Sequence, residues 1–123
     1  MVLQNSALLD GVFHALSDRT RRAMLRRLAA GERSIGELAA PFAMSFAAAS
    51  KHVRVLEGAG LLHRRVQGRL HLCRLETRPL ATVRAWVRFY ERFWSERLRA
   101  LDALLAAQDR SAEIVQTLKR VRR

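Results

Sequence analysis

The sequence predicts a mainly α-helical domain with one small β-hairpin. Two observations predict the domain: helically spaced apolar residues between positions 7 and 58, and two strand-like runs that meet at a Gln-Gly turn at 67–68. A third is the apolar stripe over 80–105, which predicts one long helix. The 123 residues fit a single domain. We expect this domain to span 1–107 and a basic tail to span 108–123.

Composition restricts the partners. The chain has 23 Lys and Arg against 11 Asp and Glu, a formal net charge of +12, which favours a polyanion such as nucleic acid or an anionic membrane surface. Only Lys51 and Lys119 are lysines, so genomic base composition is an alternative explanation for part of the arginine excess. The single cysteine excludes a disulfide framework and a Cys-rich zinc site. Neither a signal peptide nor a membrane span is indicated, and we expect a cytoplasmic protein.

The first two helices follow from apolar spacing and capping residues. Residues 7–16 carry a broad apolar stripe. Ser17 is predicted to cap a second helix that ends near Gly31, with Asp18 in its first turn. Its inward positions are Ala23, Met24, Leu25 and Leu28. Its arginines are expected on a solvated face, and the alternative is that one or two of them lie near a nucleic-acid backbone: Arg19, Arg21, Arg22, Arg26 and Arg27.

Two further helices are predicted in close succession. Ser34 and Glu37 have the spacing of a capping box, which starts a helix over 34–40. Ser45 is predicted to cap the next helix, over 45–58, whose inward face carries apolar residues: Ala49, Val53 and Leu56. Its other face is small, polar or cationic. Phe46 has two interpretations: contact with a thymine methyl if this helix binds DNA, or packing under the preceding turn. We favour the packing.

A short basic hairpin follows the glycines at 58 and 60. Leu61 and Leu62 begin a strand that turns at Gln67-Gly68 and returns through Leu70, Leu72 and Leu75. Three arginines are expected to crowd the turn: Arg64, Arg65 and Arg69.

The final predicted helix opens at Thr77 and Pro79. Its apolar residues step by threes and fours, and a second aromatic stripe runs beside them. One stripe can pack on the domain itself, and we expect the other to meet a second subunit, together with the first helix. A single thick intramolecular core is the alternative. The expected dimer-interface residues are Leu8, Leu9, Val12, Phe13, Trp86, Phe89, Tyr90, Phe93, Trp94, Leu98 and Leu101. Beyond Gln108 the pattern weakens, and we expect a mobile basic tail with at most a short helix.

These segments resemble the ArsR/SmtB family of bacterial transcriptional regulators, which are winged helix-turn-helix proteins. The resemblance covers roughly the first hundred residues. It rests on Ala15 to Asp18 with Arg19, Arg22 and Leu25 to Leu28, on Ser34 to Leu38, on Ser50 to Leu61, and on the wing Arg65 to Arg69.

The resemblance implies a dimeric repressor that places two recognition helices in successive major grooves of an inverted-repeat operator. Position on the helix face and the resemblance together select the expected recognition-helix contacts: Ser45, Ala47, Ala48, Ser50, Lys51, His52 and Arg54. The expected wing contacts, to the DNA backbone or minor groove, are Arg64, Arg65, Gln67 and Arg69. His52 is expected to pack partly or to donate to a phosphate.

No metal site or cofactor is expected. The usual metal ligands of the family have no counterpart here, because 31–40 lacks cysteine and histidine and 80–107 lacks histidine. We interpret His63, His71 and Cys73 as ordinary strand residues. An organic effector bound between subunits, or no effector, are both left open.

Two other classes of function compete. An enzyme is not expected, because the chain has no Gly-rich phosphate loop, no nucleophile and base at motif spacing, and no carboxylate cluster. A winged-helix module that binds protein instead of DNA is the alternative, and the low charge of the recognition helix gives it some support.

Overall fold

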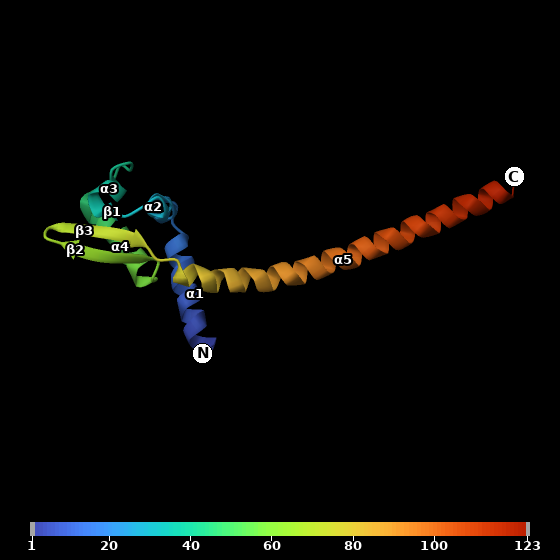
Figure 1. Cartoon of the computed structure of the whole chain (residues 1–123), viewed down its shortest axis with the longest axis horizontal. Coiled ribbons are helices and arrows are strands. Elements are labelled where there is room, and N and C mark those ends of the chain that lie inside the picture. The colour runs from blue at the N-terminus through green and yellow to red at the C-terminus, as the bar shows by residue number, and fades with distance from the viewer. Residues whose placement is uncertain (1, 123) are drawn as a thin grey trace. The chain divides into compact units, whose positions relative to one another are not determined.

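A computed structural model describes residues 2–122, with side chains described from Ser6 onward. Its contacts divide the chain into two units, Met1–Ala85 and Trp86–Arg123. The first unit contains α1 (Val2–Leu16), α2 (Arg19–Ala29), β1 (Arg33–Ser34), α3 (Ile35–Ala39), α4 (Phe46–Gly58), β2 (Leu62–Gln67) and β3 (Leu70–Leu75) (Figure 1). α5 (Arg78–Val121) begins in the first unit and supplies the second. The predicted class, mainly α with a β-hairpin, is confirmed.

The sheet has one more strand than we predicted. β2 and β3 form the expected antiparallel hairpin, with Gln67 opposite Leu70. Gly68 lies between them at φ 62°, a backbone conformation that residues with a Cβ rarely adopt. β1 adds a third strand on the other edge of β3, where Arg33 pairs with Cys73.

One hydrophobic core fills the first unit. Residues from α1 through β3 form it, and Leu80 and Val83 from the start of α5 pack against it. The fully buried core residues include Val12, Ala15, Met24, Leu38, Ala49, Val53, Leu56, Leu61 and Cys73. The predicted inward residues of 45–58 are therefore confirmed. Our placement of Val12 at a dimer interface is wrong, because this side chain is buried in the core of its own unit.

Asp18, not Ser17, caps α2. The Asp18 carboxylate accepts from the Arg21 backbone N–H at 2.9 Å, while the Ser17 hydroxyl donates back to the His14 carbonyl at 2.6 Å. The backbone hydrogen bond from Arg21 lowers the pKa of Asp18. The stabilisation from this cap is therefore present at neutral pH and is lost as the pH falls through the lowered pKa.

Removing the cap tests this assignment. We expect Asp18→Ala to lower the free energy of unfolding by about 1 kcal/mol, because one N–H of the first turn loses its acceptor. Asp18→Asn keeps an acceptor and is expected to lose less. Urea unfolding followed by circular dichroism measures both. Equal stability of wild type and Asp18→Ala, with Ser17→Ala destabilised instead, would return the cap to Ser17.

The arginines of α2 do not all lie on a solvated face as predicted. Arg21 is buried, with 8% of its surface exposed. Its Nε donates to the Ala15 carbonyl at 2.7 Å and its Nη2 to the His14 carbonyl at 2.9 Å. Arg22 donates to the Leu16 carbonyl at 2.6 Å. Both guanidinium groups thus satisfy carbonyls that a helix leaves unpaired at its C-terminal end.

α5 continues further than predicted. The helix runs unbroken through the stretch after Gln108 and ends at Val121, where we expected a mobile tail. Neither glycine nor proline occurs after Pro79, so nothing in the sequence stops the helix where the apolar stripe ends. Arg123 of the predicted tail lies outside the described residues. None of the described helices is long and apolar enough to cross a membrane.

Candidate nucleic-acid interface

α4 carries one buried and one exposed face. Ser45 is confirmed as its N-cap, since its hydroxyl accepts from the Ala48 backbone N–H at 3.1 Å. Ala49, Val53 and Leu56 are fully buried and fix the helix to the core. The opposite face is therefore held at a defined orientation toward solvent.

The exposed face of α4 contains most of the predicted recognition residues. Ser45, Ala47, Lys51 and Arg54 are exposed, whereas Ala48, Ser50 and His52 are half-buried. Among the described residues, neither Lys51 nor Arg54 has a side-chain hydrogen bond or ion pair. Small residues beside two cations that form no hydrogen bond or ion pair within the described residues make a face that can approach a groove closely and still donate charged hydrogen bonds.

Phe46 differs from our expectation. We predicted that it packs under the preceding turn, but 62% of its surface is exposed at the start of α4. An exposed ring at the N-terminal end of a recognition helix is placed for apolar contact with a thymine methyl.

α3 holds the start of α4 in place. Its predicted capping box is confirmed: Ser34 Oγ accepts from the Glu37 N–H at 3.1 Å, and Glu37 Oε1 accepts from the Ser34 N–H at 3.2 Å. α3 packs against α4, and the turn between them contributes Phe42 and Met44 to the edge of the core. α3 and α4 together are the helix-turn-helix predicted at 34–40 and 45–58.

The three wing arginines lie in different environments. Arg64 forms a bidentate ion pair with Glu57 of α4, through Nη2 to Oε1 at 2.6 Å and Nε to Oε2 at 3.1 Å. This hydrogen bonding lowers the pKa of Glu57 and raises that of Arg64. The Arg64 side chain is only 20% exposed. Its main role in this structure is to join the hairpin to the end of α4, which the sequence pattern did not reveal.

Arg65, Gln67 and Arg69, the other predicted wing contacts, are exposed. Arg65 donates to Glu32 at 2.9 Å, an exposed ion pair of the kind that contributes little to stability. Arg69 follows the turn and has no ion pair or side-chain hydrogen bond among the described residues. It is the wing cation most available to a phosphate.

Cys73 and the neighbouring histidines do not form a metal site. Cys73 is fully buried, and burial raises the pKa of its thiol, so the metal-binding thiolate is disfavoured. Within residues 2–122, no three His, Cys, Asp or Glu side chains are grouped closely enough to hold a metal ion.

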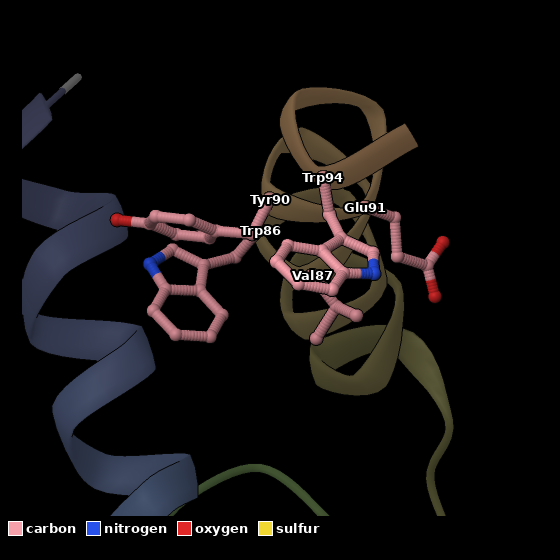
Figure 2. Close-up of a pocket in the computed structure, with 5 residues that line it drawn as sticks. All are labelled: Trp86, Val87, Tyr90, Glu91 and Trp94. Carbon is pink, nitrogen blue, oxygen red and sulfur yellow. The ribbon is translucent and has the colours of Figure 1, made fainter. Parts of the chain in front are cut away.

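The second unit presents the predicted aromatic surface (Figure 2). Trp86 and Tyr90 have ring centroids 4.8 Å apart, and Phe89 meets Tyr90 edge-on at 5.1 Å. Trp86, Val87, Tyr90, Glu91 and Trp94 line an open, mostly apolar hollow. The predicted interface residues of this unit are all exposed: Trp86, Phe89, Tyr90, Phe93, Trp94, Leu98 and Leu101. In the first unit, Leu8 and Phe13 are exposed and Leu9 is half-buried.

Comparison with known proteins found a matching family model and a similar curated protein. Residues 16–65 match a family model described as a helix-turn-helix domain. The HTH-type transcriptional regulator Rv2034 of Mycobacterium tuberculosis is 35% identical over 99 residues, which are 80% of this chain and 90% of that protein.

Two solved structures are also similar. The ArsR family transcriptional regulator RHA00566 is 39% identical, with a TM-score of 0.71 over 73% of this chain and 93% of that one. The winged helix-turn-helix DNA-binding domain of Mb0332 from Mycobacterium bovis, described as homodimeric, is 30% identical, with a TM-score of 0.54 over 70% of this chain and 82% of that one. These relatives share both sequence and fold with this chain. The chain therefore belongs to the ArsR family of winged helix-turn-helix transcriptional regulators.

Proposed function

We propose that this DNA-binding regulator acts as a dimeric repressor on an inverted-repeat operator. Each subunit would insert α4 into a major groove and place the β2–β3 turn on the neighbouring backbone. The observation that supports this best is the exposure of Lys51 and Arg54, which form no hydrogen bond or ion pair within the described residues, on a helix whose other face is buried in the core. A helix fixed in this way can hold base contacts in register.

Dimerisation is supported by the exposed aromatic surface of α5. α5 exposes large apolar side chains between Trp86 and Leu105, and α1 exposes Phe13. This is more exposed apolar surface than a monomer usually leaves in water. The Mb0332 domain is homodimeric. A symmetric dimer would give the inverted repeat its two-fold symmetry. We propose that the regulator works in the cytoplasm, where a bacterial chromosome lies.

Lys51→Ala tests the recognition helix. We expect it to weaken binding to the preferred duplex by about 1–3 kcal/mol per lost base contact, with a smaller loss on random duplex DNA. Fluorescence anisotropy on both duplexes measures the ratio of the two affinities. An equal loss on both would make Lys51 a phosphate contact and would leave base reading to its neighbours.

Arg69→Ala tests the wing separately. The loss of one phosphate contact is expected to weaken binding to preferred and random DNA alike and to reduce the slope of log affinity against log salt by about one unit per subunit. Leu70→Ala, at the next and also exposed position, serves as a control that leaves the charge unchanged. Unchanged affinity of Arg69→Ala for both duplexes would remove the wing from the interface.

A further inference from the structure

Arg21 connects three elements through one buried guanidinium group. Besides its bonds to the last turn of α1, its Nη1 lies 3.3 Å from Nδ1 of His52 on α4. A buried arginine is rare unless it is fully paired, and here every nitrogen of the group has a partner. Arg21 therefore ties the end of α1 directly to the recognition helix.

This contact fixes the tautomer of His52. A guanidinium group has only donors, so Nδ1 of His52 must accept the hydrogen bond from Arg21. In the neutral ring, the proton then lies on Nε2, as in other histidines whose second nitrogen is set by a neighbour. The nearest carboxylate oxygen, Oδ2 of Asp18, lies 4.0 Å from Nδ1 and is not a hydrogen-bond partner of that nitrogen.

The Nε2–H group of His52 faces solvent. It has no hydrogen-bond partner among the described residues. The side-chain nitrogens and oxygens of these residues that are both buried and unpaired belong to Arg27 and Arg33 alone, so Nε2 of His52 is accessible to solvent. The His52 side chain is 23% exposed. The ring is thus held by Arg21 on one side and keeps an open donor on the other.

His52 is also well placed along α4. It follows Lys51 directly and lies at the border between the buried face and the exposed face, three residues after Ala49 and one before Val53. A residue at the edge of a helix in the major groove faces the backbone rather than the base edges. The acceptor that such a donor meets on duplex DNA is a phosphate oxygen.

We propose that His52 donates from Nε2 to a DNA phosphate, and that Arg21 is the positioning residue that sets its tautomer and ring orientation. This inference rests on the DNA binding by α4 proposed above. It gives the buried Arg21 a role in binding as well as in stability, and it links α1, part of the expected dimer interface, to the angle at which α4 is presented.

His52→Phe and His52→Gln test the donor. Phenylalanine fills the space without a donor and is expected to weaken binding to random duplex DNA about threefold to tenfold per subunit, the value of one neutral hydrogen bond. A neutral N–H donor neutralises no phosphate charge, so in titrations at about pH 8 the salt slope is expected to stay unchanged, in contrast to Arg69→Ala. Glutamine restores an N–H near Nε2 and is expected to recover most of the affinity. His63→Phe, at an exposed histidine of β2, is the matched control and is expected to bind as wild type.

Two outcomes would overturn the proposal that His52 donates to a phosphate. One is unchanged DNA affinity of His52→Phe, and the other is DNA binding by His52→Gln that is as weak as that of His52→Phe. In both cases, wild-type DNA binding would leave the proposed function standing. Failure of the wild type to bind any duplex at low salt would instead contradict the proposed function itself.

A double-mutant cycle tests Arg21. Arg21→Met is expected to weaken DNA binding in the wild-type background and to add nothing in the His52→Phe background, because it acts through the ring. Additive losses would reduce Arg21 to a purely structural residue. Imidazole ¹⁵N spectra of the wild type at about pH 8, above the usual histidine pKa of about 6.5, give a readout that does not depend on the stability of Arg21→Met. We expect the Nε2–H tautomer for His52, and the Nδ1–H tautomer would refute the proposal.

Discussion

The Trp94→Glu protein is expected to sediment as a monomer at concentrations where the wild type is a dimer. Trp94 lies in the exposed apolar stripe of α5, with 62% of its surface in contact with solvent in the single chain. At a subunit interface, a carboxylate in its place would have to be buried without a partner, which costs several kcal/mol. DNA binding is expected to fail with dimerisation, since two half-sites bound by one dimer gain an affinity that one subunit lacks.

Ala103→Glu provides the matched control for Trp94→Glu. Ala103 is exposed and lies nine residues further along α5, which at about 3.6 residues per turn places it on the opposite side of the helix. The same charge there is expected to leave the dimer intact. Analytical ultracentrifugation compares the three proteins, and anisotropy on a duplex with two half-sites compares their binding. A dimeric Trp94→Glu protein would remove this stripe from the interface.

Leu56→Ala is expected to lower the free energy of unfolding by about 2–5 kcal/mol. Leu56 is fully buried on the inner face of α4, where it packs among residues of the first unit. Truncation leaves a cavity under the recognition helix, and a loss of this size is a large part of the stability of a small domain. Leu70→Ala, at an exposed leucine of the hairpin, is expected to change stability by less than about 0.5 kcal/mol. Similar losses for both leucines in urea unfolding would contradict the assigned core.

Local rules predicted the helices and the hairpin because their causes are local. The caps at Ser34 and Ser45 and the turn at Gly68 are each decided by a few neighbouring residues, and each was confirmed. Where two adjacent residues can both cap, as at Ser17 and Asp18, the sequence does not choose between them. The backbone does so in the structure, because Asp18 has the extended conformation of an N-cap (φ −98°, ψ 132°) and Ser17 does not cap α2.

The missed features depend on partners distant in sequence. β1 has only two residues and exists because Arg33 and Ser34 pair with β3 about forty residues later, which no periodicity in two residues can indicate. The burial of Arg21 depends on carbonyls of α1 and on His52, thirty-one positions away. The pairing of Arg64 with Glu57 joins a strand to a helix across a turn, so neither helical nor strand spacing predicts it.

The candidate interface was predicted more completely on α4 than on the wing. Burial of Ala49, Val53 and Leu56 fixes the outward face, so the exposure of Ala47, Lys51 and Arg54 follows from the helical repeat. On the hairpin, DNA contact was predicted for all three arginines, but in the structure Arg64 is paired with Glu57. The positions that contact DNA stay predictions until binding is measured.

Selection of binding sites from a pool of random duplexes tests whether two α4 helices bind DNA as a symmetric pair, because the protein itself chooses the sequence that it binds. We expect enrichment of inverted repeats whose half-site centres are about 10–10.5 base pairs apart, or a multiple of that distance. Recovery of no preferred sequence, with no protein–DNA complex even at low salt, would contradict operator binding by a dimer of this chain.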